Sequence, residues 1–287
     1  MIDHPASVRE HLRAHSPDLR AERIQPVGTG WDSHAYLVDD EWIVRYPRRP
    51  EVGKNLRTET TLLPWLQQRL PAAVPVPELV TAEPLCVRHR IVRGEPVARG
   101  QLGAAAGLGR FLAALHAVPV AEAVARGVPD QQRSREESRA HLADMHRRVL
   151  PLLNRAERRG GLAVLAAASA CDGHQLVHGD LGPDHVLTAG DRLAGVIDWS
   201  DARVADPARD LAWPLHGADA TFGAVVAAAY GGVPDALCDR ALGWHRLGPW
   251  YEVLHGLDGG GDAFVASGLA GVRARLPAAR GGGEPNG

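Results

Sequence analysis

The sequence predicts an α+β protein with two lobes, of which the first is rich in β-strands and the second is mainly helical. The first third of the chain alternates short β-prone runs with turn signals, whereas the rest carries apolar residues at helical spacing. A length of 287 residues accommodates one large domain or two lobes. We expect the first lobe over residues 1–93, the second over 94–287, and a disordered tail at about 278–287.

The first lobe contains five β-prone runs and one helical segment. Turn-prone GTGWD and DD sequences separate the first three runs, which indicates a three-stranded meander. A helix is expected over residues 54–70, and Pro64 should kink or break it because proline removes a helical hydrogen bond. The strands are expected over residues 22–27, 33–38, 41–47, 74–82 and 85–92.

The second lobe carries three long segments rich in Ala, Leu, Glu and Arg, with apolar residues at helical spacing. These segments cover residues 101–119, 135–160 and 161–171. The change from β-prone to helical sequence places the hinge between the lobes near residues 92–97. Two lobes joined by a hinge leave room for an enzyme cleft between them.

Composition narrows the class of protein. The net charge of −2 argues against a general nucleic-acid binder. No apolar run reaches the roughly 20 residues that span a bilayer, and the first residues are charged where a signal peptide would be apolar. The three cysteines are widely spaced, so they suggest neither a disulfide framework nor a metal site. We expect a cytoplasmic monomer with neither nucleic-acid nor membrane partners.

Two aspartates stand in similar settings in the stretch LVHGDLGPDHVLTAGDRLAGVIDWSDA, residues 176–202. Asp180 and Asp198 each follow a short apolar run, and a GD turn at residues 190–191 predicts a hairpin that brings them together. Two carboxylates with a nearby nitrogen or oxygen ligand suit a hard divalent cation such as Mg²⁺. A base, a metal carboxylate and a phosphate donor are the parts of a phosphoryl-transfer site.

This stretch resembles the aminoglycoside phosphotransferases, a family with a protein-kinase-like fold that includes the macrolide kinases. HGDLGPDH matches the catalytic loop, IDW matches the metal-binding motif, and DARVADPARDLAWPL matches the segment that follows. The resemblance implies that Asp180 is the catalytic base, and that Asp198 binds Mg²⁺ together with His185. It implies structural roles for His178, Asp206 and Asp210.

His185 and Arg45 depart from the kinase pattern. Histidine replaces the usual asparagine, although imidazole suits Mg²⁺ less well than an amide oxygen. Arginine replaces the lysine that binds the α- and β-phosphates, with Glu59 as its expected partner. Both features resemble the macrolide branch of the family, and the stretch around Arg45 also resembles a related group of aminoglycoside kinases. The residues expected to bind the nucleotide, ATP or GTP, are Gly28, Gly30, Ser33, Arg45, Glu59, Arg90 and Val92.

The acceptor side is expected in the last third of the chain. Residues 201–262 hold nine acidic residues and four arginines, interleaved with aromatic residues, so they favour a cationic acceptor with apolar surface. A solvated acidic helix face over an aromatic core explains the same pattern. The candidates for binding the acceptor are Asp201, Trp250, Tyr251 and Asp258.

The resemblance and this charge pattern together indicate a kinase that phosphorylates a hydroxyl of an amino-sugar antibiotic, a macrolide or an aminoglycoside. A kinase of the same fold for a small metabolite or a peptide antibiotic is an alternative. A second alternative is a catalytically inactive protein that binds only nucleotide.

Overall fold

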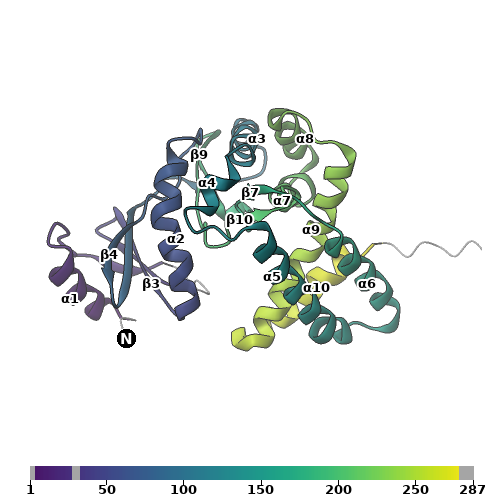
Figure 1. Cartoon of the computed structure of the whole chain (residues 1–287), viewed down its shortest axis with the longest axis horizontal. Coiled ribbons are helices and arrows are strands. Elements are labelled where there is room, and N and C mark those ends of the chain that lie inside the picture. Colours follow the sequence, from purple (N-terminus) through teal and green to yellow (C-terminus); the bar gives the residue numbers. More distant parts are fainter. Residues whose placement is uncertain (1–3, 28–32, 278–287) are drawn as a thin grey trace, which may run out of the picture.

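A five-stranded antiparallel sheet forms one end of the molecule (Figure 1). The computed structural model describes residues 4–27 and 33–277, with the backbone alone at residues 50 and 51. The sheet order is β1-β2-β3-β5-β4, so the first three strands form the expected meander. The bounds are β1 (Ile24–Pro26), β2 (Ser33–Val38), β3 (Trp42–Pro47), β4 (Glu78–Ala82) and β5 (Leu85–Arg90).

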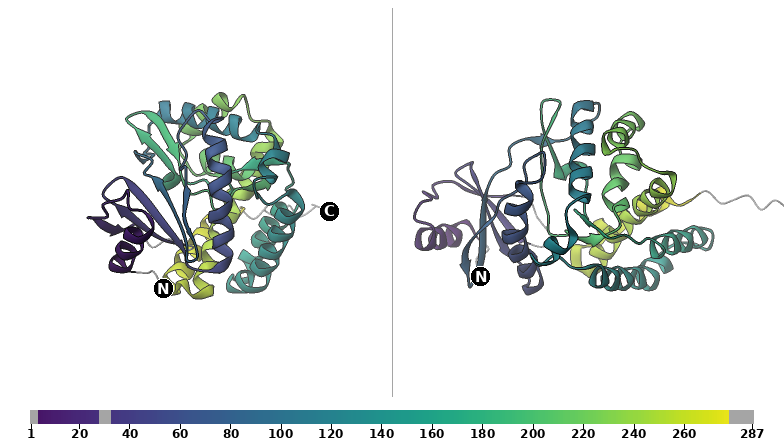
Figure 2. Two further views of the ribbon diagram at one scale, coloured as in Figure 1. Left: turned by 60° about the vertical axis from the view of Figure 1, so that its left-hand side comes forward. Right: turned by 45° about the horizontal axis from the view of Figure 1, so that its top comes forward.

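Two helices cover this sheet. The sequence analysis did not predict α1 (Pro5–His15), which places Val8 and Leu12 in a core cluster with sheet residues such as Tyr36. Helix α2 (Pro50–Gln67) lies between the sheet and the second lobe (Figures 1 and 2). The expected break at Pro64 is wrong, because α2 continues through it to Gln67, whereas the alternative of a kink stays a prediction. The neighbouring leucine and tryptophan side chains are buried in the main core, which offsets the lost hydrogen bond.

A short strand and a hairpin follow the sheet. Strand β6 (Glu95–Pro96) pairs with β8 (Val186–Ala189), which pairs with β9 (Arg192–Val196) across the predicted turn. A second small pairing joins β7 (Gln175–Val177) to β10 (Arg203–Ala205). The expected lobe boundary between residues 93 and 94 falls between β5 and β6, and it stays a prediction.

The second lobe is mainly helical, as expected. The single helix expected over residues 135–160 is two helices, because the chain leaves α-geometry after Asp144 and restarts at a capping box formed by Asn154 and Glu157. The bounds are α3 (Leu102–His116), α4 (Val120–Val124), α5 (Gln131–Asp144), α6 (Arg155–Ser169), α7 (Ala208–His216), α8 (Ala220–Tyr230), α9 (Asp235–His255) and α10 (Asp262–Arg275).

Two hydrophobic cores hold this lobe together. The larger one joins the end of α2 to α3, α7 and the strands around the catalytic motifs. The smaller one lies among α6, α9 and α10, around Met145 and Trp250. The larger core therefore ties the first lobe to the elements that carry the predicted site. Over residues 4–27 and 33–277, no helix is long and apolar enough to cross a membrane.

Candidate active site

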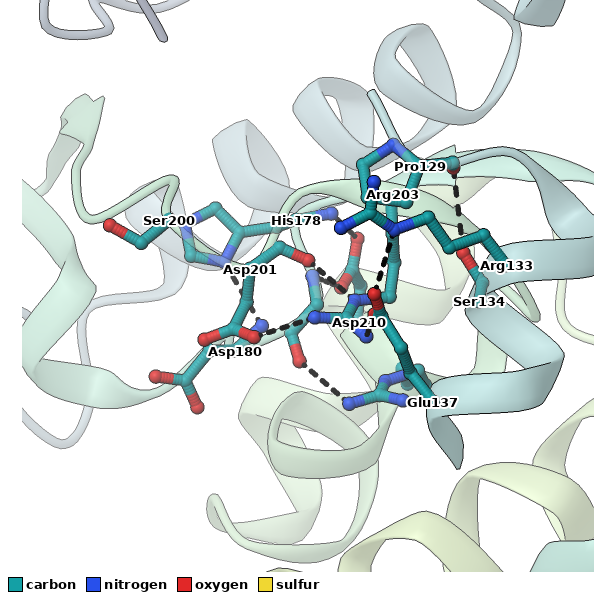
Figure 3. A network of polar contacts seen from close by, with 12 residues as sticks. Pro129, Arg133, Ser134, Glu137, His178, Asp180, Ser200, Asp201, Arg203 and Asp210 are labelled. Carbon is teal, nitrogen blue, oxygen red and sulfur yellow. Dashed lines mark hydrogen bonds and ion pairs between the residues drawn. The ribbon is translucent and has the colours of Figure 1, made fainter. Parts of the chain in front are cut away.

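The loop after β7 is fixed by a buried carboxylate. Asp210 has no exposed surface, and its oxygens accept hydrogen bonds from the backbone N–H groups of His178 (2.8 Å) and Gly179 (2.9 Å) (Figure 3). His116 Nε2 lies 3.1 Å from the same carboxylate. Burial opposes ionisation of Asp210, but these hydrogen bonds and the nearby histidines outweigh it and lower its pKa. Asp210 is thus placed to hold the loop in one conformation.

His178 connects the loop to the metal-binding motif. Its ring is buried, and Nε2 lies 2.9 Å from the carbonyl oxygen of Ile197, which can only accept. Nε2 therefore carries a proton, while Nδ1 accepts from the backbone N–H of Asp180 at 3.3 Å. The ring bridges the segments that contain Asp180 and Asp198.

A second buried carboxylate, Asp206, fixes the start of α7. It is 2% exposed and accepts from Arg240 Nε at 2.8 Å and from the backbone N–H of Ala208 at 3.1 Å. Since Arg240 belongs to α9, this contact joins two helices of the lobe. The positions of His178, Asp206 and Asp210 are consistent with the structural roles expected of them.

The backbone takes unusual conformations at both motifs. Gly179 has φ +89°, and a Cβ there would lie 2.4 Å from the carbonyl oxygen of Asp201, so only glycine fits. Asp198 has φ +65°, which is unfavourable for a residue with a side chain. Such conformations persist where the surrounding structure imposes them, and they concentrate at functional sites.

His185 lies between the two aspartates, as its place in the sequence suggested. Its Nδ1 is 2.7 Å from the Asp180 carbonyl oxygen and 3.9 Å from the Asp180 carboxylate, and its Nε2 is 3.7 Å from Asp198 Oδ2. Because the carbonyl needs a donor, Nδ1 carries a proton, and in the neutral ring Nε2 presents a lone pair toward Asp198. Two acceptors that face each other across this distance suit a cation between them.

These donors fit Mg²⁺ as an ion held only partly by protein. Within residues 4–27 and 33–277, no three His, Cys, Asp or Glu side chains form a complete metal cluster. Mg²⁺ is usually bound by one or two carboxylates, with waters and substrate phosphates completing the shell. Asp198 accepts no hydrogen bond from the described residues, so its oxygens are available.

Asp180 opens into the cleft with 65% of its side chain exposed, although protein surrounds it on the remaining sides. This partial burial raises the pKa of its carboxyl. The Asp201 and Asp198 charges raise the pKa further, whereas His185 and His178 oppose the shift. A carboxylate with a raised pKa is a better proton acceptor than an ordinary aspartate.

Arg45 is the centre of a polar cluster that we call the Arg45 cluster, formed with Ser33, Glu59 and Ser200. Arg45 donates from Nη1 to Glu59 Oε2 (2.8 Å), from Nε to Ser33 Oγ (3.2 Å) and from Nη2 to Ser200 Oγ (3.1 Å). Ser200 Oγ donates to Glu59 Oε1 at 3.0 Å. Burial raises the pKa of the Glu59 carboxyl, and the Arg45 charge opposes this shift.

The sequence analysis predicted the Arg45–Glu59 pair but missed Ser200. This serine directly follows the IDW motif, and its position beside the motif could have identified it as a site residue. Ser200 belongs to the second lobe, whereas Ser33, Arg45 and Glu59 belong to the first. The cluster therefore joins the two lobes beside Asp198.

A cleft of about 810 Å³ is lined by seven of the predicted site residues. Ser33, Arg45, Asp180, His185 and Asp198 line one part of it. The remaining wall combines acidic, basic and aromatic side chains. Its members include Asp184, Asp201, Arg209, Trp213, Trp244, His245, Tyr251, Glu252, Phe264 and Arg275.

The acidic candidates for acceptor binding differ in their partners. Asp201 lines the cleft, but Arg203 Nη2 lies 2.8 Å from its carboxylate and Glu137 holds the same arginine at 3.2 Å (Figure 3). Asp258 lies outside the cleft lining and pairs with Arg148 at 2.6 Å. Glu252 lines the cleft and has no ion pair within the described residues. It is therefore a better placed carboxylate, which the sequence analysis counted as acidic but did not select.

The two aromatic candidates lie in different environments. Tyr251 lines the cleft, and its ring packs edge-on against His141 at 5.6 Å between centroids. Trp250 is fully buried in the smaller core, where its Nε1 has no partner among the described residues. The expectation that Trp250 forms an acceptor wall is therefore wrong. Adjacent residues of a helix point about 100° apart, so one enters the cleft and the other enters the core.

Two of the remaining nucleotide candidates, Arg90 and Val92, do not line this cleft. Gly28 and Gly30 lie outside the described residues. Arg90, on β5, pairs with Glu41 at 2.6 Å and stacks over the Trp42 ring at 4.5 Å. Val92 follows β5 and lies beside β9. A contact of Arg90 or Val92 with a purine stays a prediction.

Comparisons with known proteins support the kinase-like fold. The aminoglycoside 2'-phosphotransferase-IIIa, in its GDP complex, aligns with a TM-score of 0.83 at 23% identity, covering 95% of this chain and 98% of that chain. The macrolide 2'-phosphotransferase MphH from Brachybacterium faecium aligns with a TM-score of 0.71 at 26% identity, covering 93% and 97%. Both antibiotic classes are thus matched at similar identity. The bilobal kinase-like α+β architecture expected from the sequence is confirmed.

Sequence comparisons identify the family. Uncharacterized protein YcbJ of Bacillus subtilis (strain 168) is 26% identical over 222 residues, which are 69% of this chain and 72% of that protein. The model of the phosphotransferase enzyme family, APH, matches residues 23–250, which is well over half of the chain. The chain belongs to the APH phosphotransferase family.

Proposed function

We propose that the protein transfers the γ-phosphoryl group of ATP or GTP to a hydroxyl of an amino-sugar antibiotic, a macrolide or an aminoglycoside, and so confers resistance. One observation carries this proposal: a single cleft holds Asp180, Asp198 and Arg45 together with a wall of aromatic and acidic side chains. The first three residues suit phosphoryl transfer, and the wall suits a large acceptor that carries both a charge and apolar surface.

Asp180 acts as the catalytic base. Its carboxylate accepts the proton of the acceptor hydroxyl, and the oxygen attacks the γ-phosphorus. The bond between this phosphorus and the bridging β–γ oxygen breaks, which leaves a nucleoside diphosphate. The raised pKa of Asp180 favours the proton transfer. Asp210 and His178 support the reaction indirectly because they hold the loop.

Asp198 and His185 would hold Mg²⁺, which neutralises phosphate charge when it is bound. Arg45 neutralises further phosphate charge from the first lobe, and Glu59 and Ser200 orient its guanidinium. Structures of similar fold contain GDP with kanamycin or ATP with streptomycin, which supports a nucleotide donor and a cationic acceptor.

The acceptor binds in the cleft against the wall formed by α7, α9 and α10. Trp213, Trp244 and Phe264 offer apolar surface, and Glu252 offers a carboxylate without an ion pair among the described residues. This combination favours an acceptor with one ammonium group beside a broad apolar body, which leans toward a macrolide. Arg209 and Arg275 in the same cleft disfavour acceptors with many positive charges.

Transfer of radiolabelled γ-phosphate tests the proposal. ATP and GTP are each offered with a panel of macrolides, aminoglycosides, peptide antibiotics and small amino alcohols. We expect label on an amino-sugar antibiotic with wild-type protein and none with the Asp180→Asn variant. Label only on a small amino alcohol or a peptide would overturn the acceptor class. Nucleotide binding without transfer to any acceptor would support the inactive alternative.

A further inference from the structure

A second cavity, of about 220 Å³, lies within the helical lobe, and we call it the α5 cavity. Six of its lining residues belong to α5, and the rest come from the end of α6 and the loop after it, from β10, and from Asp206, Arg209 and Trp244. Figure 1 shows α5, α6 and α9 in the same part of this lobe. Asp180, His185, Asp198 and Arg45 do not line this cavity.

The charge of the α5 cavity is positive once its ion pairs are counted. Its charged lining residues are Arg135, Arg139, Arg209, Asp172 and Asp206. Asp172 accepts from Arg135 Nε at 3.0 Å, and Asp206 accepts from Arg240 at 2.8 Å. Within the described residues, neither Arg139 nor Arg209 has a carboxylate partner. Two arginines without a counter-charge in one concave site favour an anion.

The remaining lining adds apolar surface and free hydroxyls. Leu142, Val204 and the Trp244 ring are apolar, while Ser138 and Ser169 have no hydrogen-bond partner among the described residues. The volume lies below the usual range for drug-sized ligands, so the occupant is small. A small organic anion with a flat apolar body matches the charge, the size and the lining.

The α5 cavity is linked to the catalytic loop. Arg209 and Trp244 line both this cavity and the cleft, and the guanidinium carbon lies 4.4 Å from the ring centroid. Arg209 Nη2 also donates to the carbonyl oxygen of Gly179 at 3.3 Å. Gly179 directly precedes Asp180, so the arginine that faces the cavity also supports the residue before the catalytic base.

We propose that the α5 cavity binds a small organic anion through Arg139 and Arg209, and that binding lowers phosphoryl transfer. An anion paired with Arg209 competes with the Gly179 carbonyl for the guanidinium. The loop that carries Asp180 then loses one of its supports. The binding part of this proposal is independent of the proposed function, whereas the effect on transfer rests on it.

Calorimetry with 2-naphthoate tests the binding part, using the full chain without nucleotide. The neutral 2-naphthalenemethanol is the matched probe. We expect naphthoate to bind at least about tenfold more tightly than the alcohol, and Arg139→Ala to remove about that preference. Ser138→Trp, which fills the cavity, should abolish binding. Arg159→Ala removes an exposed arginine of α6 outside the lining and should change nothing.

Equal affinity for the acid and the alcohol, or unchanged affinity in Arg139→Ala, would overturn the site. Melting curves of each variant confirm that the chain is folded. Transfer rates with saturating naphthoate then test the coupling: we expect a several-fold fall in the wild type and none in Ser138→Trp. Binding with an unchanged rate would overturn the coupling. Absence of any transfer without naphthoate would refute the proposed function and leave the calorimetric result standing.

Discussion

The two parts of the cleft are held together in different ways. Around Asp180 and Asp198, buried groups such as Asp210, His178 and Glu59 each hydrogen-bond to neighbours in several segments. On the acceptor side, Glu252 has no ion pair among the described residues, and the aromatic walls come from separate helices. Fixed hydrogen bonds preserve one geometry for the chemistry, whereas side chains without fixed partners can adapt to an acceptor.

Asp180→Asn, on the catalytic side of the cleft, should have the largest effect on turnover, because it removes the base and keeps the shape of the side chain. We expect turnover to fall by a factor of about 10² to 10⁴, the usual contribution of general base catalysis, with nucleotide affinity nearly unchanged. Steady-state kinetics and calorimetry measure the two quantities. Asp239→Asn, at an exposed carboxylate of α9 outside the cleft lining, is the control. Near-normal turnover in the first variant would remove Asp180 from the reaction.

Asp198→Ala should weaken binding of the Mg-nucleotide complex by about 10- to 100-fold or more, since the metal loses its main protein ligand. Titrations with and without Mg²⁺ separate this loss from any general effect on the site. The variant should bind nucleotide equally in both conditions. His185→Ala should cause a smaller loss and alter the preference for Mn²⁺ over Mg²⁺. Unchanged Mg-nucleotide affinity in Asp198→Ala would contradict the metal assignment.

Ser200→Ala should destabilise the folded protein by about 1–3 kcal/mol, because buried Glu59 and Arg45 each lose a hydrogen bond. The KM for nucleotide should rise as well, since Arg45 is less well oriented. Urea denaturation and kinetics measure the two effects. Ser200→Thr keeps the hydroxyl and should restore both. Loss of stability with an unchanged KM would limit Ser200 to a structural role.

Glu252→Gln should raise the KM for a cationic acceptor several-fold and leave turnover nearly unchanged, as for a group that binds ground and transition states equally. The effect should shrink at high salt. Asp258→Asn is the matched control, since this aspartate lies outside the cleft lining and is paired with Arg148. An equal rise of KM in the two variants would show that the acidic residues attract the acceptor only through their summed charge, and that Glu252 makes no specific contact.

The pH dependence of turnover should show the smallest of these effects. Asp180 must be ionised to accept a proton, so the rate should fall as pH drops through its pKa, which lies above the ordinary 3.8. Because the Asp201 charge raises that pKa, Asp201→Asn should move the acid limb to lower pH. Asp258→Asn should leave the limb in place. A shift in the opposite direction would contradict the electrostatic role of Asp201.

The catalytic part of the site was predictable because its residues lie in short contiguous motifs joined by a two-residue turn. Asp180, His185 and Asp198 meet through one hairpin, so sequence spacing determines their contact. The acceptor wall combines residues from α7, α9 and α10. Which of their side chains face the cleft depends on how these helices pack. Trp250 and Tyr251 illustrate this, since neighbours in sequence lie in the core and in the cleft respectively.

The elements of the fold show the same difference between features set by local sequence and features set by packing. Strands with turn signals between them were predicted to within a few residues, because the alternation is local. Helix α1 was missed because its amphipathic pattern spans only three turns and its apolar residues matter only against the sheet. Pro64 was misjudged because burial of its neighbours, which sequence does not report, compensates for it.

Gly195 on β9 lies where two segments of the first lobe come close to the hairpin that leads to Asp198. A Cβ there would lie 2.6 Å both from the carbonyl oxygen of Ala73, between α2 and β4, and from a side-chain carbon of Val92, just after β5. Two segments of the first lobe therefore meet the strand that leads, three residues later, to Asp198. Any side chain at position 195 would have to displace one of these segments, so glycine is what allows the first lobe to pack this closely against the strand before Asp198.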